Sequence, residues 1–170
     1  METVLLVKNN DIVKNTIISG NTDVDRMNPA VKAYQTTYLK PILGKTLYDK
    51  LCTDFASNSL VGVYLELYEE YVQPMVIHGS TALYIESGAY FVGNSGITKL
   101  NTDNAQAVSK EEVDYLVNAA QKLHNAYERD LFKWLPNQSI PEYTASSTSC
   151  GSGGNRINVG GWSLKKRGGC

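Results

Sequence analysis

Apolar residues recur every three or four positions along most of the first 134 residues, which predicts a series of amphipathic helices. The first begins at Asn28-Pro29, a cap followed by the proline preferred in a first turn, and the second covers about residues 45–57. Between them, Pro41 disfavours helical backbone at Lys40, and Gly44 suits the left-handed conformation that ends a helix. We therefore expect the chain to turn there. The apolar positions of the first helix are Val31, Tyr34, Tyr38 and Ile42, and those of the second are Leu47, Leu51 and Phe55.

A third helix is predicted from Leu60 to about Val92. Pro74 lies inside its apolar pattern. Because proline removes one amide donor and crowds the preceding turn, we expect a kink near residues 70–74 rather than an end. The apolar positions of this helix are Leu60, Tyr64, Leu67, Tyr68, Tyr71, Val72, Met75 and Val76.

The fourth predicted helix is also long and follows Ser109. Ser109-Lys-Glu-Glu112 has the form of a capping box, in which the serine and the glutamate each satisfy one exposed backbone amide. Pro136 is expected to end the helix. Its apolar face consists of Val113, Leu116, Ala120, Leu123, Tyr127, Leu131 and Trp134.

The remaining segments carry weaker patterns. Asn10 is expected to cap a short helix that runs to Asn15, whereas residues 4–7 fit either a strand or an extended arm. Residues 93–108 are polar and rich in turn formers, which predicts a surface loop. The fold class is therefore all-α: a small helical bundle with a long C-terminal helix and an extended C-terminal arm.

The expected organisation has three parts. Residues 1–22 form an N-terminal arm or short element, residues 23–136 the helical domain, and residues 137–170 an extended arm rich in glycine, serine and basic residues. Charge divides the chain in the same way. Of the 16 basic and 17 acidic residues, four basic and no acidic ones follow Glu142, so the preceding part holds a net charge of −5 (12 − 17).

The arm has two interpretations. Lys165, Lys166 and Arg167 beside Trp162 fit contact with phosphate backbones, with the indole stacked on a base. In the second interpretation, which we favour, apolar residues alternate as a short strand that adds to a sheet edge on a partner, while the basic end meets an acidic surface. The alternating residues are Ile157, Val159, Trp162 and Leu164.

Chemistry-bearing motifs are weak throughout. Gly44-Lys45-Thr46 ends like a phosphate-binding loop, but position 39 is leucine where that motif needs glycine. His78 and His124 lie on different predicted helices without cysteine partners, and the acidic pairs fit caps and solvated faces. We expect no enzyme activity, no cofactor and no metal.

Cellular context follows from what the chain lacks. It has no run of apolar residues long enough to span a membrane and no basic start of a secretory signal, so we expect no membrane association and a cytosolic setting. Cys52, Cys150 and Cys170 have no close pair, and we expect free thiols. A Cys150–Cys170 bridge is the alternative.

Tyrosine is the one residue type in excess, with 11 copies. Its ring and polar tip suit half-buried positions and subunit interfaces. Most tyrosines lie on the apolar stripes and are expected in the core, whereas three lie off the stripes or at the ends of elements. Together with the arm, these give the predicted interface residues: Tyr90, Tyr115, Tyr143, Arg156, Ile157, Val159, Trp162, Leu164, Lys165, Lys166 and Arg167.

The run QTTYLKPILGKTLYDKL, from Gln35 to Leu51, follows Asp23-Val-Asp25 and precedes a tyrosine-rich helix. This combination resembles the small helical head-tail connector proteins of tailed bacteriophages, and it is most similar to those of crAss-like and related phages of Bacteroidetes hosts. The resemblance covers about residues 10–135. Its sharpest motif is Pro41-Ile-Leu-Gly44 followed by Leu47-Tyr48.

The resemblance implies a structural protein of the virion, assembled in the host bacterial cytoplasm. Copies would form a ring, commonly of twelve, beneath the portal protein. The ring would join the capsid to the next tail or ring protein and line a channel through which DNA passes without specific binding. Closed rotational symmetry requires one face of each subunit to meet a different face of its neighbour. The alternative function is a nucleic-acid-binding helical module that uses the basic arm.

Overall fold

The structure, a computed structural model, describes residues 4–19, 22, 24–88, 90–93, 96–99 and 109–143. Its elements in chain order are α1 (Asn9–Asn15), α2 (Val24–Tyr34), the π-helical segment η1 (Gln35–Leu39), α3 (Lys40–Leu43), α4 (Lys45–Ala56), α5 (Val63–Glu66), the π-helical segment η2 (Leu67–Val72), α6 (Gln73–Gly88), β1 (Tyr90–Gly93), β2 (Gly96–Lys99), α7 (Lys110–Trp134) and the 3-10 turn η3 (Leu135–Asn137). The predicted helical bundle with a long C-terminal helix is confirmed. Most of the predicted arm, beyond residue 143, lies outside the described residues.

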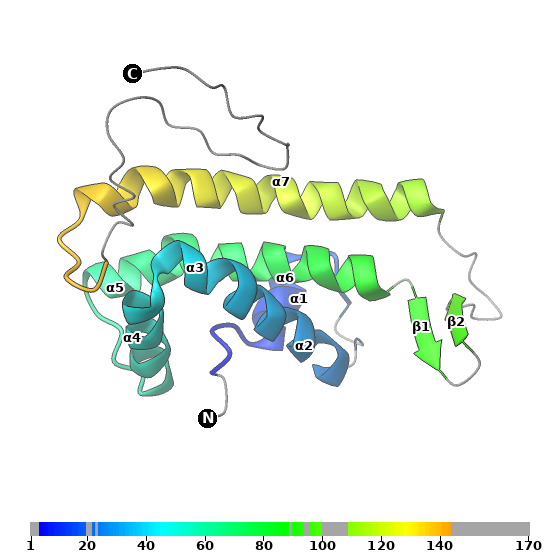
Figure 1. Cartoon of the computed structure of the whole chain (residues 1–170), viewed down its shortest axis with the longest axis horizontal. Helices are drawn as coiled ribbons and strands as arrows, with labels where there is room; N and C mark the ends of the chain where they lie inside the picture. Colours follow the sequence, from blue (N-terminus) through cyan, green and yellow to red (C-terminus); the bar gives the residue numbers. More distant parts are fainter. Residues whose placement is uncertain are drawn as a thin grey trace, which may run out of the picture.

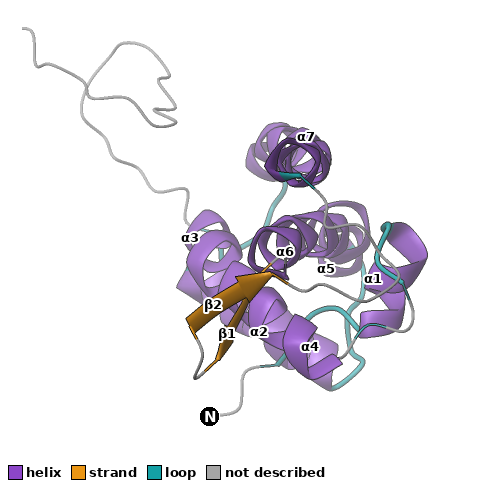
Figure 2. Cartoon of the chain, turned by 90° about the vertical axis from the view of Figure 1, so that its right-hand side faces the viewer, coloured by secondary structure: helices purple, strands orange, loops and turns teal. Residues whose placement is uncertain are grey.

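Helix α6 is the central element of the bundle. It packs against α7 on one side and against α1 and α2 on the other (Figure 1). The view along the long axis shows α7 standing alone above α6, with α3 beside α6 and with α2 and α4 below (Figure 2). The hydrophobic pattern explains the arrangement, because most side chains of residues 75–82 are buried whichever way they point.

The core is a single cluster that reaches from the N-terminal segment to the residues after α7. Leu6, Val7 and Ile12 belong to it together with Leu131 and Ile140. Residues before position 22 therefore pack into the same core as the helices. Its other buried members are Ile18, Met27, Val31, Tyr34, Leu39, Leu43, Leu47, Tyr48, Leu51, Leu67, Tyr68, Val72, Met75, Val76, Ile77 and Leu135.

A buried glutamine fastens the N-terminal segment. The Gln35 side chain accepts a hydrogen bond from the Leu6 amide (2.9 Å) and donates to the Val4 carbonyl (3.0 Å) and the Tyr48 hydroxyl (3.1 Å). The Tyr68 hydroxyl donates to the Leu6 carbonyl (2.7 Å), and burial raises the pKa of both tyrosines to about 12. Residues 4–7 are thus irregular rather than a strand, and side chains supply the hydrogen bonds that a neighbouring strand would otherwise make to this backbone.

Both π-helical segments end two residues before a proline. Segment η1 ends at Leu39 ahead of Pro41, and η2 ends at Val72 ahead of Pro74. A proline ring crowds the carbonyl four residues earlier, and a wider turn relieves that clash without ending the helix. Lys40 accordingly keeps helical angles (φ −60, ψ −42), so the expectation that Pro41 displaces it was wrong. The predicted turn itself is confirmed, at Gly44, whose φ is +78.

Several predicted boundaries need correction. The Asn28-Pro29 pair does not start a helix, because α2 begins at Val24 and Pro29 lies inside it. Met27 and Val31 are both buried, and that burial outweighs the local cap preference. Likewise, the cap position of α1 is Lys8 rather than Asn10, with the Lys8 amide bonded to Asp11 (3.1 Å).

The region after α6 differs most from expectation. The helix ends at Gly88 instead of Val92, and strands β1 and β2 pair antiparallel where the end of that helix and the start of a loop were predicted. By contrast, the capping box of α7 is confirmed, since Ser109 and Glu112 exchange hydrogen bonds of 2.8 and 3.2 Å.

Candidate interaction surfaces

Helix α7 is covered on one side only. Of its side chains, those of Ala120 and Leu131 are buried, whereas Tyr115, Leu123 and Phe132 are 73, 49 and 41 % exposed. Leu123 was predicted on the buried stripe, and the structure places it at the margin instead. At 100° per residue it lies about 80° around the helix from Leu131, where α6 no longer covers it.

A hydrogen bond and a ring contact, both between Tyr34 and His124, hold the middle of α7 against α2. The Tyr34 hydroxyl lies 2.6 Å from His124 Nε2, and its ring meets that imidazole edge to face. Tyr34 is buried against Gly79, where a Cβ atom would lie only 2.1 Å from the ring. Burial, with Glu128 nearby, raises the pKa of Tyr34 well above its ordinary range. Helices α2, α6 and α7 therefore meet at one closely packed point.

A second group fastens α7 to α6 and η2 on the other flank. The His78 ring stacks on Tyr127 with centroids 5.9 Å apart, and Tyr71 packs on Trp134 at 5.1 Å. The Trp134 indole also donates to Glu66 (3.0 Å). These contacts hold the C-terminal half of α7, whereas the half from Lys110 to Leu123 has only Ala120 buried.

A shallow pocket of about 210 Å³ lies on this flank, between α1, η2, α6 and α7. Burial and the nearby His124 lower the pKa of His78, one of its lining residues. The pocket is lined by Asn15, Glu69, Glu70, Gln73, Pro74, Ile77, His78 and Tyr127. Among the described residues, no three histidine, cysteine or acidic side chains gather as a metal site would require.

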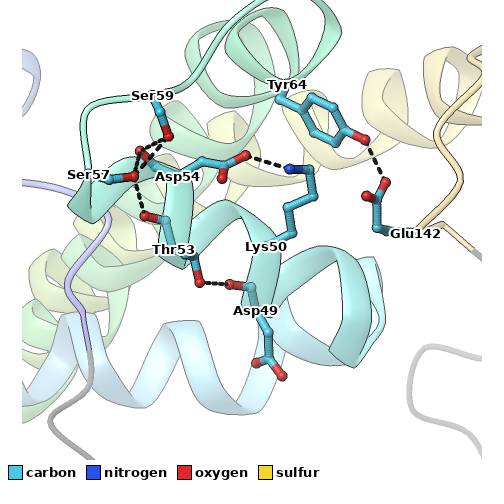
Figure 3. Close-up of polar contacts among 8 residues, drawn as sticks. All are labelled: Asp49, Lys50, Thr53, Asp54, Ser57, Ser59, Tyr64 and Glu142. Atoms are coloured by element: carbon cyan, nitrogen blue, oxygen red, sulfur yellow. Dashed lines mark hydrogen bonds and ion pairs between the residues drawn. The ribbon is translucent and has the colours of Figure 1, made fainter.

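The C-terminal segment is attached to the body by a polar cluster (Figure 3). The Tyr64 hydroxyl donates to Glu142 (2.5 Å), which lowers the pKa of that carboxyl. Lys50 lies 4.7 Å from the centroid of the Tyr64 ring and forms an ion pair with Asp54 (2.9 Å). Tyr143 is half-buried against the core. The point at which the chain leaves the described body is thus fixed beside α4 and α5.

The other hydroxyls in Figure 3 belong to the end of α4. Thr53 donates to the Asp49 carbonyl (2.9 Å), Ser57 donates to the Thr53 carbonyl (2.9 Å), and Ser57 and Ser59 share a hydrogen bond (2.8 Å). The Thr53 carbonyl also accepts a hydrogen bond from the Ser57 amide (3.1 Å), so the Ser57 hydroxyl adds a second bond to a carbonyl in the last turn of the helix. The group is a helix terminus.

The predicted interface residues fall into three groups. Tyr115 is exposed on α7 and Tyr143 is half-buried at the attachment point, so the structure does not bring these two together. Tyr90 is the first residue of β1. The arm residues lie outside the described part of the chain: Arg156, Ile157, Val159, Trp162, Leu164, Lys165, Lys166 and Arg167.

Sequence reasoning missed two features of these surfaces. Phe132 lies off the apolar stripe of α7, which is itself a sign of an outward position. The hairpin had a signal as well, since the sequence places two residues, Asn94 and Ser95, between glycines that follow and precede short runs of strand formers. Of the cysteines, Cys52 is a free thiol, as predicted, and burial raises its pKa. Cys150 and Cys170 lie outside the described residues.

In the part of the chain that the structure describes, no helix is both long and apolar enough to cross a membrane. No curated protein and no solved structure matches the sequence. Residues 39–153 match a family of unknown function, DUF6712, and this stretch runs from the end of η1 past α7. Because the match extends over more than half of the chain, the protein belongs to the DUF6712 family.

Proposed function

We propose that this protein is a structural subunit of a phage virion, one copy of a ring that lies beneath the portal protein and joins it to the next tail or ring component. The exposed apolar side chains of α7 carry the proposal. A long helix that is packed on one side and presents Tyr115, Leu123 and Phe132 to solvent has the character of a subunit interface.

The sequence resemblance supplies the biological setting for this interface. The Pro41 to Gly44 corner, which carries the resemblance, covers the end of α3, and Gly44 separates α3 from α4. In a ring, the outer side of α7 would meet a different face of the adjacent subunit, as closed rotational symmetry requires. The channel would then be bounded by the bodies of the subunits.

Charge supports a passive role toward DNA. The first 142 residues carry a formal net charge of −5, so the body would repel rather than hold a phosphate backbone. In this proposal DNA passes through the channel without specific binding, and the basic arm contacts a protein partner. The ring assembles in the host cytoplasm and remains in the virion.

Light scattering of the purified protein, alone and mixed with the portal protein of the same phage, tests the proposal. We expect a defined multi-subunit mass in at least the mixed sample. The variant Tyr115→Ser/Leu123→Ser should lose it, because both side chains would leave the interface. Ile17→Ser/Val61→Ser is the matched control, since those side chains are each 69 % exposed and do not belong to α7. A monomer that ignores the portal would overturn the proposal.

A further inference from the structure

The β1–β2 hairpin is a two-stranded sheet with no third strand among the described residues. Its strands pair from Tyr90 with Lys99 to Gly93 with Gly96. The hairpin follows α6 directly and projects beyond its end (Figure 1). Both strands are therefore edge strands, each with one row of backbone groups that the other strand does not use.

An isolated hairpin of this size is marginally stable in water, and a third strand is the usual remedy. An exposed edge recruits an extended segment through main-chain hydrogen bonds, whatever the side chains are. The hairpin thus has the backbone chemistry to accept a strand from elsewhere.

The chain itself contains a fitting segment. Residues 157–164 hold two alternating apolar pairs, Ile157 with Val159 and Trp162 with Leu164. The phase of the alternation shifts at Gly160-Gly161, and a pair of glycines accommodates the bulge that such a shift needs. This segment is the part of the arm best suited to strand addition.

Distance favours a neighbouring copy as the source of the strand. The contact between Tyr64 and Glu142 fixes the root of the arm, and the helical path from Tyr64 to Gly88 is about 36 Å long at 1.5 Å per residue. A Gly/Ser-rich linker such as residues 144–156 spans about 20 Å on average and about 45 Å when fully extended. Reaching the hairpin of its own chain would stretch the linker close to its limit.

We propose that residues 157–164 of one copy add as a third strand to the β1–β2 hairpin of a neighbouring copy. The inference rests on the proposed ring in one respect, that copies of the chain lie side by side. It names the contact of the arm, and it gives the hairpin a role in holding adjacent subunits together.

The pairing is tested without a ring by adding a peptide of residues 155–167 to the chain truncated after residue 143, which retains the whole buried cluster. We expect the peptide to slow hydrogen exchange of amides in one hairpin strand by about tenfold or more. A peptide with Val159→Pro should have no effect, because proline removes a donor and the strand conformation, whereas Asn155→Pro lies ahead of the strand and should act as the parent does. Unchanged exchange with the parent peptide, or equal protection by all three peptides, would overturn the pairing.

The full chain tests which copy donates the strand. Protection of the hairpin amides should rise with protein concentration, should be lost in Val159→Pro, and should persist in the linker control Ser147→Pro. Protection that is independent of concentration would assign the strand to the same copy and overturn the proposal. A ring that forms with unprotected hairpins would defeat this inference alone. If the peptide protects the hairpin of the truncated chain but the full chain forms no ring, alone or with the portal protein, the pairing would be upheld and the proposed function defeated.

Discussion

Helices α6 and α7 lie side by side, yet they are built in opposite ways. In α6, of 16 residues, even the polar Ser80 and Thr81 are buried, with their hydroxyls bonded to carbonyls of their own helix. In α7, of 25 residues, only Ala120 and Leu131 are buried. The contrast shows that neighbouring elements surround the middle of α6, whereas one side of α7 stays exposed to solvent.

The largest expected difference in stability is between two leucine substitutions on α7, one on its buried side and one on its exposed side. Leu131→Ala should lower the free energy of unfolding by about 2–5 kcal/mol, because it leaves a cavity under a fully buried side chain. Leu123→Ala, the same change on the half-exposed margin, should cost less than about 1 kcal/mol. Urea denaturation measures both. Equal losses would mean that the outer side of α7 is not free.

The point where α2, α6 and α7 meet should tolerate no added volume. Gly79→Ala places a Cβ atom 2.1 Å from Tyr34, whose ring must shift and weaken its contact with His124. We expect a loss of about 1–3 kcal/mol by thermal or urea unfolding. Gly88→Ala is the matched control in the same helix, since its nearest neighbour would be 3.9 Å away. A loss at position 88 as large as at position 79 would contradict the packing.

Removal of the amide of Gln35 should release the N-terminal segment. Gln35→Met keeps the side chain's length but leaves the Leu6 amide and Val4 carbonyl without that partner, which should cost about 1–3 kcal/mol. Hydrogen exchange at the Leu6 amide should accelerate by more than the global loss explains. The exposed neighbour Thr36→Ala is the control, and its Leu6 amide should exchange as in the parent protein.

The smallest expected effect is a pH dependence at His78. Burial lowers its pKa in the folded protein below the ordinary 6.5, so the unfolded chain takes up the proton more readily. The stabilisation is complete above about pH 6.5 and declines as the pH falls toward the folded pKa. Unfolding midpoints at pH 7.5 and 5.5 should therefore differ more in the parent than in His78→Gln. An identical shift in both would rule out His78 as the source.

Local patterns predicted the parts of the fold that local interactions determine. The Ser109–Glu112 capping box and the apolar period of α7 are both contained within a few turns, and both are found in the structure. The Gly44 corner is equally local. By contrast, the start of α2 at Val24 depends on burial of Met27 by distant segments, which a cap signal does not record.

The surfaces were less predictable for the same reason. Gln35 accepts a hydrogen bond from Leu6, 29 positions away, so periodicity gave no sign of a glutamine in the core. The exposure of Leu123 depends on how far α6 extends around α7, which no pattern within α7 reveals. The hairpin follows a helix whose apolar pattern continues past its end, and that continuation concealed the two short strands.

The most direct test of the proposed ring is electron cryomicroscopy of the portal protein mixed with this protein. We predict a ring of this chain beneath the portal, with an open axial channel and with Tyr115 and Leu123 of each subunit covered by its neighbour. A portal with nothing bound, or a ring in which the outer side of α7 faces solvent all round, would contradict the account.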